Sequence, residues 1–164
     1  MKKILLIKHG SLGDIISSTS VINDIKKHFT GDQIYILTSN KFKDFFHELN
    51  FFDNIIIDNR EGISNTIEVI KKIFNLKIDL IIDLQNSKRT SVYAFILRIF
   101  SKIKINGTGV FSTHRYKYDK MNMPSVIDGL SNQIELLGIT TLRKPYLNWL
   151  IKDKFNFNKI NNKN

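Results

Sequence analysis

Short runs of apolar residues recur along the chain at intervals that suit buried β-strands. The first run, Ile4-Leu5-Leu6-Ile7, contains no polar residue, which is typical of a strand covered by helices on both faces of a sheet. Four later runs are also rich in aliphatic residues. The predicted strands span residues 4–7, 33–38, 55–57, 80–82 and 103–105.

Segments with apolar residues at helical spacing lie between these strands. In the first of them Ile15, Ile22 and Ile25 fall on one stripe, and Thr30-Gly31 ends the pattern. The predicted helices span residues 14–29, 41–49, 63–75, 89–101 and 125–137. Because strand and helix alternate five times, the sequence predicts an α/β fold, a Rossmann-like, doubly wound parallel sheet.

Residues 107–124 form a long, basic and aromatic stretch without clear periodicity. Loops of this length in compact domains are often lids or binding loops. Beyond Pro145, residues 146–151 could form one more strand or a docking segment, and the Asn/Lys-rich tail from Lys152 is expected to fray. We therefore expect a Rossmann-like domain over residues 1–145, followed by an interdomain-type segment and polar tail over residues 146–164.

Composition narrows the class of protein. A chain of 164 residues with 42% hydrophobic residues suits one globular domain. It has no cysteine, which excludes disulfides and thiolate metal sites and fits a reducing compartment. No apolar run approaches the roughly 20 residues that span a bilayer, and the amino terminus does not resemble a signal peptide. These features predict a cytoplasmic protein.

The net charge of +10 favours an anionic partner such as a phosphorylated substrate, an acidic membrane surface or nucleic acid. Solvated surface lysine explains the same charge equally well. The chain carries no helix-turn-helix, zinc or base-stacking motif, so we expect no nucleic-acid partner.

The segment Lys8-His9-Gly10-Ser11-Leu12-Gly13-Asp14 follows the first strand and opens the first helix. Such a corner lies at the carboxyl edge of a sheet, where open α/β folds place their ligands. Ser11-x-x-Asp14 matches a capping box, and an acid in the first helical turn is favourable in any case. Alternatively, Asp14 is a general base that accepts a proton from a sugar hydroxyl.

Other nucleotide-binding patterns fit poorly. Gly10-x-x-Gly13 is neither the dinucleotide fingerprint nor a P-loop. A phosphoacceptor switch requires acids after the first strand, where Lys8 and His9 stand.

The segment from Ile4 to Ile16 resembles the opening of the glycosyltransferase family 9 enzymes, the ADP-heptose:lipopolysaccharide heptosyltransferases. Asp83-Leu84-Gln85, followed by Arg89-Thr90, is similar to the family's Asp-x-Gln-Gly segment and its downstream Lys-Ser. The helix that ends at Gly138 is similar to the helix closing the family's amino-terminal domain. Asn86 stands where the family has Gly, and its side chain is expected to narrow the approach there.

The resemblance implies the amino-terminal half of a GT-B enzyme, which is metal-independent and inverting. On that pattern Asp14 is the catalytic base, and Ser11 and Gly13 shape the turn and present N–H groups to substrate oxygens. Basic residues near strand ends are candidates to bind phosphates and carboxylates. The predicted substrate-binding residues are Lys8, Ser11, Gly13, Arg60, Gln85, Arg89 and Arg115.

The implied acceptor is an anionic, lipid-linked sugar of the lipid A–Kdo type, in lipopolysaccharide inner-core synthesis at the inner face of the inner membrane. The implied donor is an ADP-heptose-type sugar bound by a second domain that 164 residues cannot include, so the isolated chain is expected to be inactive. No cofactor or metal is expected. The alternative is a non-catalytic Rossmann-like module that binds an anionic ligand or partner.

Overall fold

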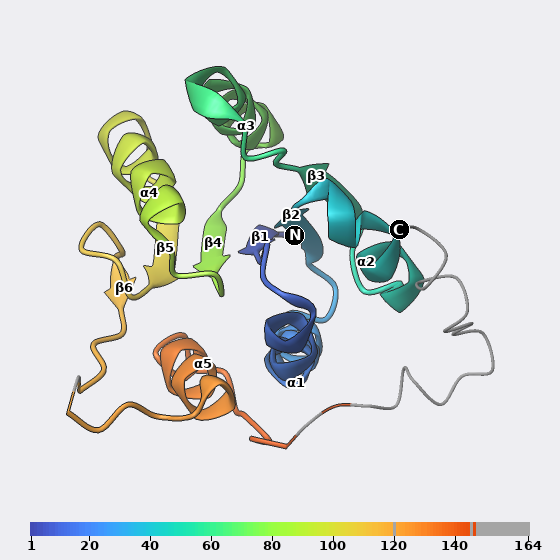
Figure 1. Cartoon of the computed structure of the whole chain (residues 1–164), viewed down its shortest axis with the longest axis vertical. Coiled ribbons are helices and arrows are strands. Elements are labelled where there is room, and N and C mark those ends of the chain that lie inside the picture. The colour runs from blue at the N-terminus through green and yellow to red at the C-terminus, as the bar shows by residue number, and fades with distance from the viewer. Residues whose placement is uncertain (120, 145, 147–164) are drawn as a thin grey trace.

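The computed structural model describes residues 1–119, 121–144 and 146. A single parallel sheet of six strands, in the order β3-β2-β1-β4-β5-β6, forms the centre of this part of the chain (Figure 1). The strands are β1 (Lys3–Ile7), β2 (Gln33–Thr38), β3 (Asn54–Ile57), β4 (Leu80–Asp83), β5 (Lys104–Gly107) and β6 (His114–Arg115). The predicted doubly wound parallel sheet is confirmed.

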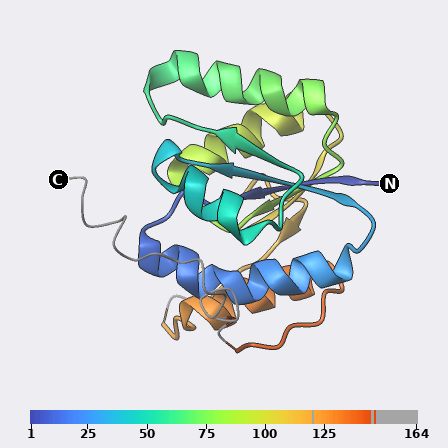
Figure 2. The same ribbon diagram turned by 90° about the vertical axis from the view of Figure 1, so that its right-hand side faces the viewer.

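Helices cover both faces of the sheet, so that the fold has three layers (Figure 2). α1 and α5 lie on one face together with α2, and α3 and α4 lie on the other. The helices are α1 (Leu12–His28), the short 3-10 helix η1 (Asn40–Phe42), α2 (Lys43–Leu49), α3 (Gly62–Leu76), α4 (Lys88–Phe100) and α5 (Val126–Glu135). All five predicted helices are present, with bounds that differ by at most two residues.

Two hydrophobic cores follow from the alternation of side chains along each strand. Ile4 and Leu6 of β1 pack in the core under α1, α2 and α5. Leu5 and Ile7 pack in the core under α3 and α4. All four side chains are almost completely buried, which explains why this strand shows no polar position.

The predicted loop over residues 107–124 requires one correction, because it contains the edge strand β6. Asn106 and Gly107 of β5 pair in parallel with His114 and Arg115. A strand of two polar residues leaves no hydrophobic pattern in the sequence. The predicted segment 146–151 and the tail lie outside the described residues, apart from Tyr146.

From β1 the chain builds the sheet in one direction through β2 and β3, and from β4 it builds in the other direction through β5 and β6. The boundary between the neighbours β1 and β4 is therefore a topological switch point. Open α/β sheets bind ligands in the crevice outside the carboxyl ends of such strands. The β1–α1 turn lies at this position, with Gly10 at a φ of +20°. A Cβ at Gly10 would lie 3.2 Å from Cβ of Asp14, so the close approach of turn and helix favours glycine.

Candidate functional site

The β1–α1 corner holds a carboxylate and an ammonium close together. Asp14 is half-buried in the first turn of α1, and its Oδ2 accepts from Oγ of Ser11 at 3.1 Å and from the Ser11 backbone N–H at 3.4 Å. Ser11 Oγ in turn accepts from the Asp14 backbone N–H, which completes the predicted capping box. The cap holds the helix start in place, and Asp14 also lines a pocket.

Lys8 is buried beneath this corner, with 4% of its surface exposed. Its Nζ donates to the carbonyl oxygen of Leu84 at 3.1 Å. Burial lowers the pKa of the Lys8 ammonium, and the negative charges of Asp14 and Asp83 oppose that effect. The Lys8 ammonium therefore lies under the electrostatic influence of both the Asp14 and the Asp83 carboxyl groups.

Gln85 connects the turn after β1 to the turn after β4. Its Oε1 accepts from the backbone N–H groups of His9 at 2.9 Å and Gly10 at 2.8 Å. The β4 turn is itself held by Asp83, whose Oδ1 accepts from the backbone N–H groups of Gln85 and Asn86. Burial raises the pKa of Asp83, although these hydrogen bonds and one from Thr90 act in the other direction.

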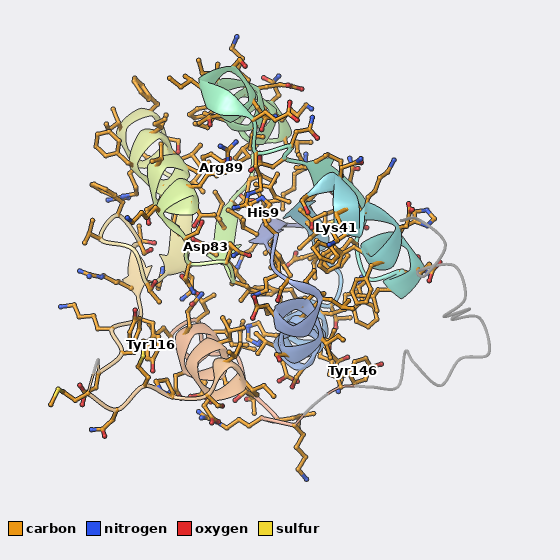
Figure 3. All side chains as sticks on the ribbon, in the orientation of Figure 1. His9, Lys41, Asp83, Arg89, Tyr116 and Tyr146 are labelled. Carbon is orange, nitrogen blue, oxygen red and sulfur yellow. The ribbon has the colours of Figure 1, made fainter. Side chains whose placement is uncertain are left out.

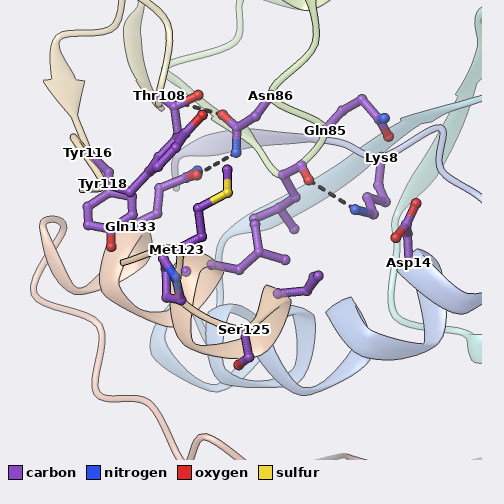
Figure 4. A pocket seen from close by; sticks show the side chains of 15 residues that line it. Lys8, Asp14, Gln85, Asn86, Thr108, Tyr116, Tyr118, Met123, Ser125 and Gln133 are labelled. Atoms are coloured by element: carbon purple, nitrogen blue, oxygen red, sulfur yellow. Dashed lines mark hydrogen bonds between the residues drawn. The ribbon is translucent and has the colours of Figure 1, made fainter. Parts of the chain in front are cut away.

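A pocket of about 320 Å³ opens beside this corner, between the carboxyl edge of the sheet and the N-terminal half of α5 (Figure 4). Lys8 and Asp14 lie at one end, and Tyr116 and Tyr118 lie at the other. The lining residues are Lys8, Asp14, Leu84, Gln85, Asn86, Thr108, Tyr116, Tyr118, Met123, Pro124, Ser125, Val126, Gly129, Leu130 and Gln133. Its volume suits a small ligand such as a monosaccharide unit.

A network of side-chain amides forms the back wall of the pocket. Gln133 accepts from Nδ2 of Asn86 at 2.7 Å and donates to the carbonyl oxygen of Asp83 and to Oδ1 of Asn106, both at 3.0 Å. Oδ1 of Asn86 accepts from the Thr108 backbone N–H at 2.9 Å. Gln133 and Asn106 are fully buried, and their mutual hydrogen bonds keep this wall in one arrangement.

Asn86 stands at the position where the family resemblance predicts a glycine, and its conformation shows how the turn accommodates a side chain there. Its φ of +50° lies in the left-handed region, which glycine and asparagine adopt most readily. Its side chain lies beside Gly107, and a Cβ added at Gly107 would lie 3.4 Å from Asn86 Oδ1. The substitution therefore keeps the turn and adds an amide to the pocket wall.

The sequence-predicted site residues fall into two groups. Lys8, Asp14 and Gln85 come together at the pocket. Ser11 and Gly13 are exposed at the start of α1, and a Cβ at Gly13 would meet only Ser11 Oγ, at 4.0 Å. Arg60 and Arg115 are exposed, and Nε of Arg115 donates to the Thr108 carbonyl oxygen at 3.1 Å. Neither arginine lines the pocket.

Arg89 belongs to a different cluster, which lies on the side of the sheet covered by α3 and α4. Arg89 lies between α4 and α3, whereas Tyr116 lies beside α5 (Figure 3). Nε and Nη2 of Arg89 donate to the two carboxylate oxygens of Asp58 at 3.1 and 2.9 Å. Tyr93 donates to the same carboxylate at 2.6 Å, and Nε2 of His9 lies 3.1 Å from it. We call these four residues the Asp58 cluster.

The carboxylate of Asp58 is fully buried but well supplied with donors. Burial pushes its pKa upward, but the nearby His9 ring and hydrogen bonds from Arg89, Tyr93 and the Arg60 backbone N–H outweigh burial and hold the pKa well below its usual range. Asp58 is therefore ionised in the folded chain, and Arg89 is its bidentate partner.

We predict that Asp58→Asn lowers the free energy of unfolding at pH 7 by about 3 kcal/mol, because the Arg89 guanidinium loses its charged partner. The pKa of Asp58 is lower in the folded chain than in the unfolded chain. Its stabilisation is therefore complete above the unfolded pKa of about 3.9 and is lost as the pH falls below that value. Urea unfolding at pH 7 and pH 3 measures both effects.

The wild type should lose more stability than Asp58→Asn between these two pH values. Asp44→Asn, which removes an exposed carboxylate from the first turn of α2, serves as the control and should unfold like the wild type. Equal losses for the wild type and Asp58→Asn would contradict the assignment.

Sequence reasoning missed most of the pocket wall. Tyr116, Tyr118 and Met123 fall in the stretch 107–124, for which the sequence predicts only a long loop. Gln133 was missed although it shares the apolar stripe of α5 with Leu130, where a polar residue marks a buried hydrogen bond.

Within the described residues, no group of three or more His, Cys, Asp or Glu side chains is placed to hold a metal ion. No helix in the same part of the chain is both long and apolar enough to cross a membrane.

Comparison with known proteins gave matches among solved structures only. No family model and no curated protein matches the chain. A glycosyl transferase family 9 protein from Veillonella parvula matches with a TM-score of 0.68 and 25% identity, over 88% of this chain and 43% of that protein.

Two structures from E. coli match at lower identity. Heptosyltransferase WaaC, solved with ADP-2-deoxy-2-fluoro heptose, has a TM-score of 0.64 and 12% identity, over 87% of this chain and 50% of WaaC. ADP-heptose lps heptosyltransferase II has a TM-score of 0.63 and 18% identity, over 81% of this chain and 40% of that protein. The chain therefore spans half or less of the length of these proteins. The resemblance to glycosyltransferase family 9 is confirmed by this structural match, and the fold of the chain resembles one domain of the GT-B heptosyltransferases.

Proposed function

We propose that this chain is the acceptor-binding half of a glycosyltransferase and that Asp14 is its catalytic base. The pocket receives the acceptor sugar, and a second domain presents an ADP-sugar of the heptose type. The observation that carries the proposal is the position of Asp14: its carboxylate lines a sugar-sized pocket at the switch point of the sheet. The similar E. coli proteins, WaaC in complex with ADP-2-deoxy-2-fluoro heptose and ADP-heptose lps heptosyltransferase II, support the choice of donor.

The proposed reaction is an inverting displacement at the anomeric carbon of the donor. The acceptor hydroxyl transfers its proton to a carboxylate oxygen of Asp14 while its oxygen bonds to the anomeric carbon of the donor. The bond from that carbon to the diphosphate oxygen breaks, and ADP leaves with the electron pair from the opposite face, so the configuration is inverted. Lys8 Nζ remains hydrogen-bonded to the Leu84 carbonyl oxygen, and its positive charge lies at the same end of the pocket as the Asp14 carboxylate.

We predict that Asp14→Asn lowers the transfer rate by about 10²–10⁴-fold, because an amide cannot accept the proton. The measurement is sugar transfer by the complete enzyme, or by this chain reconstituted with a donor-binding domain. Circular dichroism should show an unchanged fold. Turnover at the wild-type rate would disprove the assignment of the base.

The chain offers a matched control for the capping role of Asp14. Ser125 and Asp128 begin α5 with the same spacing: Ser125 Oγ donates to Asp128 Oδ2 at 2.6 Å and accepts from the Asp128 N–H at 3.2 Å. Asp128→Asn removes an equivalent helix-start carboxylate that does not line the pocket. It should cost less than about 1 kcal/mol and leave transfer unchanged.

The second candidate is a non-catalytic module that binds an anionic ligand, and the buried cation Lys8 favours it. Calorimetric titration of the chain separates the two functions. Acceptor sugar should bind to the chain while ADP does not, because the donor belongs to the second domain. Binding of phosphate or ADP at Lys8 without any sugar binding would favour the module instead.

A lipid-linked acceptor requires the enzyme to bind at a lipid surface. The outer surface of α4 has features that suit binding to an anionic bilayer. Phe100, Ile99 and Phe95 are 72, 57 and 44% exposed, and the ring of Phe95 contacts that of Phe111 at 4.8 Å between centroids. Residues 84–118 contain no Asp or Glu. Exposed apolar side chains with basic neighbours are typical of surfaces that bind acidic bilayers. The exposed basic residues near this surface are Lys88, Arg98, Lys102 and Lys104.

We predict that the chain co-sediments with vesicles containing phosphatidylglycerol more strongly than with phosphatidylcholine vesicles, and that salt weakens the binding. Phe100→Ser and Ile99→Ser should each reduce the bound fraction. Ile63→Ser changes a residue of α3 that is 79% exposed, and it should have no effect. Equal losses for all three variants would argue against α4 as the contact surface.

A further inference from the structure

His9 is held through both its backbone and its side chain. Its backbone N–H donates to Oε1 of Gln85 at 2.9 Å, which connects it to the turn after β4. Its ring is buried, with 2% of the residue exposed, and Nε2 lies 3.1 Å from Oδ2 of Asp58 in the turn after β3. One residue of the β1–α1 turn therefore contacts the turns that follow two other strands.

The alternation of side chains that continues from β1 places His9 away from the pocket. Leu5 and Ile7 of β1 face α3 and α4, and His9 lies on the same side of the sheet as Arg89 (Figure 3). Lys8 lies on the other side and lines the pocket, whereas His9 is not among the described residues that line it. An effect of the His9 ring on a bound ligand must therefore act through the turn.

Asp58 is fixed without help from His9. Its carboxylate accepts two hydrogen bonds from Arg89, one from Tyr93 and one from the Arg60 backbone N–H. These donors satisfy the buried charge, so the carboxylate does not need the ring as a further partner. The ring, in contrast, depends on Asp58, because Nε2 of His9 is buried and makes no hydrogen bond of good geometry within the described residues.

The charge of Asp58 orients the His9 ring. Asp58 is ionised, as its low pKa requires. A nitrogen lone pair only 3.1 Å from a carboxylate oxygen would be repelled, so a hydrogen lies on Nε2. Electrostatic attraction to a fixed partner therefore holds the ring, and with it the start of the turn.

Few other side chains attach the turn between His9 and α1 to the rest of the fold. Residues 10 to 13 are exposed or half-buried, and the next buried side chain along the chain is that of Ile15. The capping box acts within the start of α1 and does not attach it to the sheet. The position of the turn therefore depends on the bonds to Gln85, the ring of His9 and the side chain of Ile15.

We infer that His9 is a positioning residue for the proposed base: its contact with Asp58 fixes the turn from which Asp14 reaches the pocket. This inference rests on the proposed function, because the role of Asp14 gives the position of the turn a catalytic consequence. A small displacement of a reacting group lowers the rate strongly. His9 therefore acts on the rate of transfer rather than on binding of the acceptor.

Two substitutions each remove one contact with the same carboxylate oxygen. His9→Leu keeps a side chain of similar size and removes Nε2. Tyr93→Phe is the matched control, because it removes the 2.6 Å hydrogen bond from α4 to Oδ2 of Asp58 and lies outside the lining of the pocket. Since this bond is the shorter of the two contacts, Tyr93→Phe should lower the urea midpoint at least as much as His9→Leu.

Transfer is measured with the complete enzyme, or with this chain reconstituted with a donor-binding domain. His9→Leu should lower kcat by about tenfold or more and leave KM for the acceptor within about threefold. Tyr93→Phe should leave kcat within about twofold of the wild type. His9→Gln, whose amide N–H can face Asp58, should recover part of the rate.

Hydrogen exchange in the full chain tests the position of the turn without an assay of activity. The Gly10 N–H, which donates to Gln85 Oε1 at 2.8 Å, reports on the turn, and the Leu5 N–H reports on the centre of β1. In His9→Leu the Gly10 amide should exchange about tenfold faster relative to the Leu5 amide, and in Tyr93→Phe this ratio should not change. The nitrogen shifts of the wild-type ring should show a hydrogen on Nε2.

The outcomes separate this inference from the proposed function. Equal effects of His9→Leu and Tyr93→Phe on both readouts, or a ring without hydrogen on Nε2, would overturn the inference. Faster exchange with unchanged kcat, in an enzyme that Asp14→Asn inactivates, would also overturn it and leave the proposed function in place. If Asp14→Asn transfers sugar at the wild-type rate, the proposed function fails and the positioning of a base fails with it, whatever the exchange shows.

Discussion

The hydrogen bonds from the His9 and Gly10 N–H groups to Gln85 Oε1 join the two turns on which the site depends. One turn follows β1 and carries Asp14, and the other follows β4 and carries Asn86. Both turns lie at the switch point because the strands are parallel and β1 is the neighbour of β4. Without this connection, Asp14 and the amide wall would be held only by separate loops.

Electrostatic balance within the site contrasts with the excess positive charge of the chain. Arg89 forms an ion pair with Asp58, whereas Lys8 donates to the Leu84 carbonyl oxygen and is influenced by the charges of Asp14 and Asp83. Because an uncompensated charge is costly to bury, cations that lack such a partner remain exposed, as Lys117 and Lys102 do. The net charge therefore describes the outer surface, above all around α4, and gives little information about the ligand in the pocket.

Asp14 both caps the start of α1 and lines the pocket. Its contacts with Ser11 hold the start of α1, and its carboxylate borders the pocket. The pair Ser125–Asp128 shows that the capping interaction alone does not place a carboxylate in the pocket lining. What distinguishes Asp14 is its place after the central strand β1, opposite the turn of β4.

Local pattern in the sequence was sufficient to predict the helices, five of the strands and the corner that carries Lys8 and Asp14. The apolar run Ile4–Ile7 and the spacing of Ser11 and Asp14 depend on neighbours within a few residues, so they can be identified without the fold. The contacts Asn86–Thr108, Arg89–Asp58 and Asn86–Gln133 join residues that are 22, 31 and 47 positions apart along the chain. Only the tertiary structure decided that Arg89 pairs with Asp58, that Asn86 and Gln133 form the pocket wall, and that Tyr116 and Tyr118, which follow β6, line the pocket. These choices depend on which strand ends meet at the sheet edge, and no local pattern of hydrophobic residues encodes that arrangement.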